Sequence, residues 1–195
     1  PAEMHRVPLH ELCLQIKLLE LGEIETFLAK ALEPPHEQAV REAVSTLGEL
    51  QALDKREDLT PLGRHLATLP VDVRIGKMLL FACMLRCLEP VLIIAAGLSL
   101  RNPFLEPFDK REQAKAARRA FADRLRSDHL ALLEAYRAFR KASLAGVGVA
   151  KGREFCSRNF ISFEAFAQME QATLSTVCEA ECARAWARVW AWECA

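Results

Sequence analysis

The 195-residue sequence lacks the short motifs by which many enzymes hold a nucleotide or activate a nucleophile. It has no GxxxxGK(S/T) loop for nucleotide phosphates, no GxSxG turn, no HExxH helix and no DxDxDG calcium loop. Its five histidines are scattered, and no pair of its carboxylates stands out as an acid and base couple. We therefore expect a binding or coupling module that has no catalytic residue, cofactor site or metal site of its own.

The sequence also lacks an uninterrupted apolar run. Its most apolar stretch, residues 78–100, has Arg86 and the pair Glu89-Pro90 in its middle, whereas a membrane-spanning helix needs about 20 predominantly apolar residues. We expect two buried helices separated by a break at Glu89-Pro90, and no membrane association. No signal peptide is visible, and the start at Pro1 suggests a piece of a longer protein or a processed chain.

A disulfide framework is not evident, because the seven cysteines are odd in number and the chain is not small. We therefore expect a reducing compartment. Cys83 and Cys87, like Cys178 and Cys182, are four residues apart on helical patterns. Zinc binding is one interpretation, but the glycine and polar neighbours of a metal-binding turn are missing. Burial as small apolar side chains is the favoured interpretation.

The formal net charge is zero, but its distribution is uneven. Residues 1–60 contain 6 basic and 12 acidic side chains, whereas residues 101–158 contain 14 basic and 7 acidic ones. Such a local basic excess can attract phosphates, although charge alone fits a solvated helix face of mixed sign equally well. We interpret one group of basic residues as a solvated outer face of this kind: Lys110, Arg111, Lys115, Arg118 and Arg119.

Apolar residues recur with the helical period through almost the whole chain, so we expect a mainly α protein. Leu53 and Leu59 flank a charged tip, which predicts a short two-stranded β-hairpin. Three helices followed by such a hairpin are typical of a winged helix. We place a winged-helix domain at residues 1–70, a helical bundle at 71–170 and a divergent tail at 171–195.

The stretch LTPLGRHLATLP, residues 59–70, has the signals of a short helix. Thr60 can cap it, Pro61 suits its first position, and Pro70 ends it. Gly63 costs about 1 kcal/mol in such a helix. Its presence therefore predicts that the backbone approaches the hairpin too closely for a side chain.

Several segments occur in an order and spacing that point to one family: RVPLHELCLQIKLLELG, LTPLGRHLATLPVD, RSDHLALLEAYRAF and FCSRNFIS. Over about residues 5–170 the chain resembles the helicase-associated region of DEAH-box (DExH) RNA helicases, most of all the branch that includes RNA helicase A. The resemblance implies a winged helix and then a helical bundle, the ratchet, located after RecA-like motor domains. It also implies that the intact protein is an ATP-dependent 3′ to 5′ RNA helicase whose ATP and Mg²⁺ bind in those upstream domains.

The resemblance further implies roles for parts of this chain. The winged helix packs on the motor domains, where Arg64 and His65 are expected to serve interdomain contact. The ratchet closes one side of a single-stranded RNA channel. RNA contacts are expected at two segments, from these residues: Arg126, Asp128, His129, Arg158 and Asn159. Alternatively, Asp128 and His129 form a cap that braces the bundle, and Arg158 is a surface charge.

The end of the chain departs from the family pattern. After about Met169 the sequence becomes STVCEAECARAWARVWAWECA, which leaves open whether an OB-fold follows. The Trp-rich end, with Trp186, Trp190 and Trp192, is interpreted as an aggregation risk or a partner site. The expected partners are single-stranded or structured RNA, the motor domains, and an OB-fold or protein activator. The expected localisation is intracellular, either cytoplasmic or nuclear.

Two other functions remain open at this stage. A free-standing winged-helix DNA-binding protein needs a basic recognition helix in the major groove. The best candidate helix, residues 36–50, has Arg41 as its only Lys or Arg among several glutamates, so it would repel DNA. A scaffold that binds a protein activator and no RNA is the second alternative.

Overall fold

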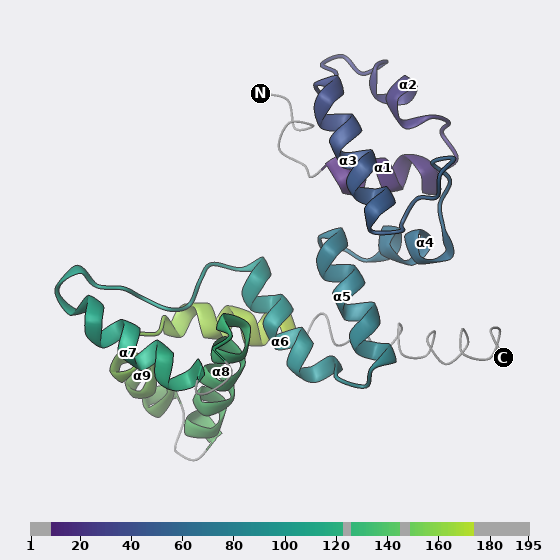
Figure 1. Ribbon diagram of the computed structural model, residues 1–195. Coiled ribbons are helices and arrows are strands. Elements are labelled where there is room, and N and C mark those ends of the chain that lie inside the picture. Colours follow the sequence, from purple (N-terminus) through teal and green to yellow (C-terminus); the bar gives the residue numbers. More distant parts are fainter. Residues whose placement is uncertain (1–8, 123–125, 145–148, 174–195) are drawn as a thin grey trace. The chain divides into compact units, whose positions relative to one another are not determined.

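A computed structural model describes residues 9–122, 126–144 and 149–173 (Figure 1). These residues are mostly helical, which confirms the predicted fold class. They divide into two compact units, one ending at Leu80 and the next beginning at Phe81. The predicted domain boundaries at residues 70 and 170 stay predictions. Across the described ranges, no helix is both long enough and apolar enough to cross a membrane.

The first unit is built around its first helix. Its helices are α1 (Leu9–Leu18), α2 (Ile24–Leu28), α3 (Glu37–Glu49), α4 (Pro61–Thr68) and the first part of α5 (Val73–Met84). α1 packs against α2, α3 and α4, and α2 also packs against α3. Leu14 and Ile16 of α1, with Leu47 of α3, are almost completely buried. The apolar stripe predicted for α3 therefore faces this core.

The segment between α3 and α4 differs from the prediction. Leu53 and Leu59 form a single antiparallel bridge, and no strand is formed there. The Asp54 carboxylate closes the tip by accepting bonds from the backbone N–H groups of Arg56 (2.7 Å) and Asp58 (2.9 Å). These bonds hold the pKa of Asp54 below its ordinary value. The predicted two-stranded hairpin is thus replaced by a tight turn that a side chain closes.

The start of α4 confirms the prediction for Gly63. Thr60 caps the helix, because its Oγ1 accepts a bond from Gly63 N (3.0 Å) while donating to Gln51 O (2.6 Å). A Cβ atom added to Gly63 would lie 2.0 Å from the backbone oxygen of Ala52. The two backbones are therefore in direct contact, and only glycine fits at this position.

The break between the two apolar helices lies earlier than predicted. α5 ends at Met84, and α6 (Leu88–Ser99) begins after a turn in which Arg86 has a φ of 57°. Pro90 lies in the first turn of α6, where its missing N–H is not needed. Cys83 is on α5 and Cys87 precedes α6, so these two half-buried cysteines do not share one continuous helix.

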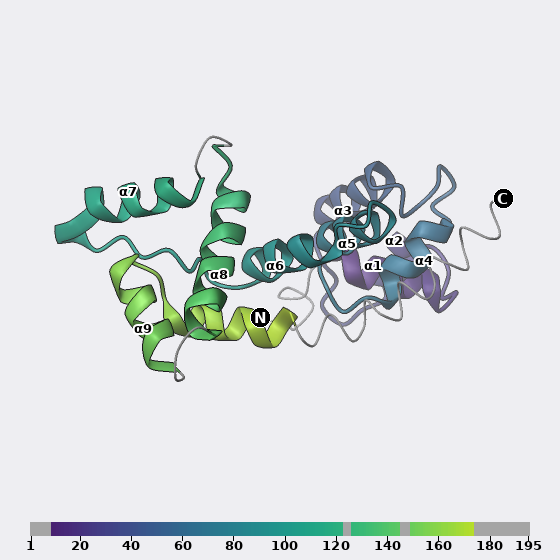
Figure 2. The ribbon, with the colours of Figure 1, turned by 90° about the horizontal axis from the view of Figure 1, so that it is seen from below.

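The second unit is assembled around α8. Its elements after α6 are η2 (Phe108–Lys110), α7 (Arg111–Ala122), α8 (Asp128–Leu144), α9 (Val149–Arg158) and a further helix described over residues 163–173. α8 packs against α6, α7 and α9 (Figure 2). Its Tyr136 and Phe139 rings lie 5.5 Å and 5.2 Å from the ring of Phe166, centroid to centroid. All three side chains are buried, and burial raises the pKa of Tyr136 to about 12.

We expect Gly63→Ala to destabilise the protein by about 1–3 kcal/mol, because the added methyl group must push the Ala52 backbone away. Gly48→Ala is the matched control. A Cβ atom at that α3 position meets nothing within 4 Å, so the change should stabilise by up to about 1 kcal/mol. Urea unfolding of both variants measures the two effects. Equal stabilities for the two variants would contradict the close contact at Gly63.

Candidate nucleic-acid interface

The start of α8 carries the first group of predicted RNA-contacting residues. Ser127 caps this helix, since its Oγ accepts a bond from Leu130 N (3.4 Å) and its carbonyl accepts one from Ala131 N (2.9 Å). Arg126 precedes the cap, with an exposed side chain and a left-handed backbone (φ 46°). His129, in the first turn, is also exposed. Its imidazole and the Arg126 guanidinium are thus accessible at the positive end of a helix dipole.

Asp128, between them, forms an ion pair within the protein, although its side chain is 77% exposed. Its Oδ1 lies 3.0 Å from Nη2 of Arg118 on α7. Only 29% of the Arg118 side chain is exposed, and its Cζ lies 5.1 Å from the centre of the Phe104 ring. Arg118 therefore does not belong to a solvated outer face, as the charged run suggested. Asp128 was predicted either to contact RNA or to brace the bundle, and this contact favours the second alternative.

The second group of predicted RNA-contacting residues lies where α9 ends. Arg158 is 76% exposed and forms an ion pair with Glu154 one turn earlier. Asn159 donates from Nδ2 to the carbonyl of Phe155 (2.8 Å), so its side chain caps the end of the helix. Arg158 is thus an accessible cation with one anionic partner, and Asn159 has a structural role whether or not it also meets RNA.

The segment after Asn159 is joined to the connector between α6 and η2. Phe104 and Ile161 form an antiparallel bridge. Leu105 N donates to Phe160 O (2.7 Å), and Ser162 N donates to Pro103 O (2.8 Å). Two segments nearly sixty residues apart in sequence therefore share backbone hydrogen bonds. This pairing fixes the chain directly after Arg158 and Asn159.

Sequence reasoning missed an open groove of about 570 Å³ between α6 and α8. Its charged lining residues are Glu89, Arg137, Arg140 and Lys141. The Arg137 guanidinium donates to Glu89 and Glu134, each at 3.1 Å, and its hydrogen bond to Glu89 is the main cause of its raised pKa. The spacing of Arg137, Arg140 and Lys141 on one helix was the available signal, but the pairing with Glu89 depends on the fold.

Arg64 and His65, the residues predicted for interdomain contact, differ in exposure. Arg64 on α4 is exposed, so its charge is available to a neighbouring domain. His65 is half-buried, and its burial lowers the pKa of the imidazole. The neutral form of His65 is therefore favoured in the folded protein.

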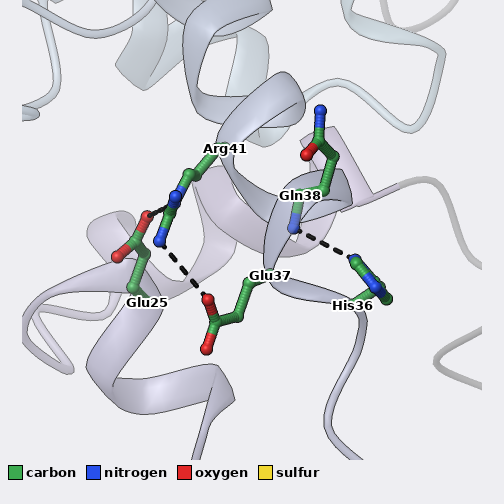
Figure 3. Close-up of polar contacts among 5 residues, drawn as sticks. All are labelled: Glu25, His36, Glu37, Gln38 and Arg41. Atoms are coloured by element: carbon green, nitrogen blue, oxygen red, sulfur yellow. Dashed lines mark hydrogen bonds and ion pairs between the residues drawn. The ribbon is translucent and has the colours of Figure 1, made fainter.

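The basic residue on α3 is neutralised within the first unit (Figure 3). Arg41 forms ion pairs with Glu25 of α2 and Glu37 of α3, both at 3.3 Å. His36, at the N-cap, accepts a bond from the backbone N–H of Gln38 (3.3 Å). A helix with this charge pattern offers little attraction to a DNA phosphate backbone, which argues against the free-standing DNA-binding alternative.

The described residues contain no cluster of three or more His, Cys, Asp or Glu side chains that could hold a metal ion. Burial raises the pKa of the Cys13 and Cys156 thiols to about 11, so both stay protonated at neutral pH. Cys178, Cys182 and the Trp-rich end lie outside the described residues.

The lowered pKa of His65 predicts a pH-dependent stability. The unfolded chain binds this proton more readily than the folded protein, so the stabilisation is present above pH of about 6.5. It is lost as the pH falls below that value towards the lower folded pKa. We expect the free energy of unfolding to decrease less between pH 7 and pH 5 in His65→Gln than in the wild type. Urea unfolding across this range provides the measurement, and parallel curves would contradict the prediction.

Comparisons with known proteins give two consecutive family matches on this chain. The family described as "Helicase associated domain (HA2), winged-helix" matches residues 43–71, and "Helicase associated domain (HA2), ratchet-like" matches residues 72–132. DExH-box ATP-dependent RNA helicase DExH1 of Arabidopsis thaliana is 49% identical over 168 residues, which are 86% of this chain and 16% of that protein. ATP-dependent DNA/RNA helicase DHX36 of Homo sapiens is 48% identical over 82% of this chain and 16% of its own length.

Putative ATP-dependent RNA helicase DHX57 of Homo sapiens is 44% identical over 86% of this chain and 12% of its own length. The chain therefore spans about one sixth or less of these curated relatives. The matched part contains both helicase-associated units in the same order as the resemblance implied. The chain belongs to the helicase-associated (HA2) family, as a winged-helix and ratchet-like region of the kind found in DExH-box RNA helicases.

Proposed function

We propose that the intact protein is an ATP-dependent RNA helicase in which this chain forms the winged-helix and ratchet region. The ratchet closes one side of the single-stranded RNA channel, and the winged helix couples motor-domain movement to translocation in the 3′ to 5′ direction. The observation that carries the proposal is the consecutive match of both helicase-associated units, at residues 43–71 and 72–132. ATP and Mg²⁺ bind in the motor domains, outside this chain.

The charge of the second unit supports contact with RNA. Residues 101–158 contain 14 basic and 7 acidic side chains. Arg126 and Arg158 are both exposed, and each is the first residue of a segment with predicted RNA contacts, 126–129 and 158–159. Recognition of single strands through backbone charge and base stacking tolerates many sequences. This fits a translocating enzyme, which must bind each nucleotide in turn.

Individual side chains have distinct roles in the proposed interface. Arg126 and Arg158 contact phosphates, and the exposed His129 imidazole stacks on or hydrogen-bonds to a base. Asn159 donates one amide hydrogen to Phe155 O, while its Oδ1 accepts from a base or a ribose hydroxyl. Asp128, held by Arg118, acts in the interface only through the position of its neighbours.

The first unit is proposed as the part that docks on the motor domains. Arg64 is exposed on α4, and the Gly63 contact fixes this helix against the chain before it. A rigidly held helix transmits a displacement better than a mobile one. An OB-fold and a protein activator are further proposed partners, and the proposed localisation is intracellular, either cytoplasmic or nuclear.

Charge reversal tests the RNA contact. We expect the double variant Arg126→Glu with Arg158→Glu to bind single-stranded RNA at least about tenfold more weakly, equivalent to about 1.4 kcal/mol. The control, Lys30→Glu with Lys55→Glu, changes the net charge equally at exposed positions of the first unit. Ultraviolet crosslinking and fluorescence anisotropy at fixed salt give the two readouts. Unchanged crosslinking in the first variant would favour the scaffold alternative.

We also expect the purified chain to hydrolyse no ATP, with or without RNA, because the motor motifs are absent from its sequence. Release of inorganic phosphate is the measurement, with an RNA-stimulated P-loop ATPase as the positive control. Hydrolysis that copurifies with the chain through successive columns would contradict this division of labour.

A further inference from the structure

We propose that Arg118 is a positioning residue that fixes the two RNA-contacting segments, residues 126–129 and 158–159, relative to each other. The inference rests on the proposed function, because the RNA contacts of those segments are themselves proposed. Arg118 does not itself contact Arg126 or Arg158, the cations expected to meet RNA. It acts through Asp128 on one side and through Phe104 on the other.

The contact with Asp128 fixes the start of α8. The Arg118 Nη2 and Asp128 Oδ1 atoms are 3.0 Å apart. Asp128 is the first residue of α8, directly after the Ser127 cap. Its carboxylate also interacts favourably with the positive end of the helix. Holding Asp128 therefore determines where Arg126 and His129, on either side of it, are presented.

The contact with Phe104 reaches the other segment. The Arg118 guanidinium lies over the Phe104 ring, at a distance typical of a cation–π contact. Phe104 is bridged to Ile161, with backbone hydrogen bonds from Leu105 N to Phe160 O and from Ser162 N to Pro103 O. The paired strand-like segment begins immediately after Arg158 and Asn159. One guanidinium thus connects the start of α8 with the end of α9.

Arg118 lies on the face of α7 that packs against the rest of the second unit. Ala114, one turn earlier, is 4% exposed, and Phe121, three residues later, packs its ring against Phe155 of α9 at 6.2 Å. Arg118 Nε is itself shielded from water and has no hydrogen-bond partner among the described residues. Arg119, the next residue, is exposed and forms no ion pair with the described part of the chain. Two adjacent arginines therefore have different environments.

Arginine is suited to this role and lysine is not. A planar guanidinium can lie flat on an aromatic ring while one of its edges donates to a carboxylate. The ammonium group of lysine can still pair with Asp128 but cannot stack in this way. Arg118→Lys should therefore keep the α8 contact and weaken the Phe104 contact, which separates the two functions of the side chain.

Amide hydrogen exchange of the full chain tests the positioning without RNA. In Arg118→Ala we expect exchange to become about threefold faster both at Leu130 and Ala131 of α8 and at Leu105 and Ser162 of the paired segments. Arg119→Ala, the matched control, should leave both groups of amides as in the wild type. Wild-type protection of either group in Arg118→Ala would overturn the proposal.

If Arg118→Ala does not fold, Arg118→Lys and Asp128→Asn replace it. Arg118→Lys should speed exchange at Leu105 and Ser162 and spare the α8 amides. Asp128→Asn should do the opposite. Identical exchange patterns in these two variants would overturn the proposal.

RNA binding tests the consequence. With a labelled oligouridine of about 12 nucleotides, Arg118→Ala should bind about fivefold more weakly than Arg119→Ala, an effect of the size that substitutions produce through a contact network. Arg118→Lys should recover part of the loss. If the wild type binds no oligouridine, the proposed function fails while the exchange result stands. If the wild type binds and the two alanine variants bind equally, the positioning role fails alone.

Discussion

The packing of Phe166 edge-on to Tyr136, and obliquely to Phe139, is the contact on which the second unit depends. It joins the last described helix to α8, and α8 in turn packs against α6, α7 and α9. Burial of aromatic side chains of this size is among the largest stabilising terms available to a small helical unit. The same buried cluster includes Cys156 of α9, so it also contributes to the positions of the helix ends that carry the proposed RNA-contacting residues. The positions of these exposed cations thus depend on the buried aromatic cluster.

Many of the charges that suggested nucleic-acid binding are used within the protein. Arg41 pairs with two glutamates, Arg137 with two more, and Arg118 with Asp128. These partly exposed pairs contribute modestly to stability, about 0–1 kcal/mol each, but they orient side chains and lower the local potential. A count of basic residues therefore overstates the charge available to RNA. Exposed cations such as Arg126, together with Arg158, which is exposed and paired with one glutamate, are better indicators than the composition of a segment.

The sequence was sufficient for the features that depend on local pattern. Helical periodicity predicted the mainly α fold, the helix cap is at Thr60 as predicted, and Gly63 signalled a close backbone contact. Features in which two local conformations of the same segment compete were not predictable from the sequence. Pairing at the wing is limited to the Leu53–Leu59 bridge, with the tip closed by the Asp54 carboxylate. The helix break lies at a non-glycine residue, Arg86, in a left-handed conformation. At the candidate interface, the charged run around Arg118 indicated a solvated outer face, and nothing in the sequence connected Arg118 with Phe104 or Asp128.

The burial of Tyr136 has a spectroscopic consequence. It is the only tyrosine in the chain, and it belongs to the core of the second unit. Its hydroxyl has a pKa near 12 in the folded protein, against an ordinary value of 10.0. At a pH between these values, Tyr136 is mostly protonated in the folded protein and mostly ionised where the second unit is unfolded, so the ultraviolet absorption of tyrosinate increases when that unit unfolds. The chain therefore contains a natural optical probe that reports on the ratchet-like unit and is silent about the winged-helix unit beside it in the sequence.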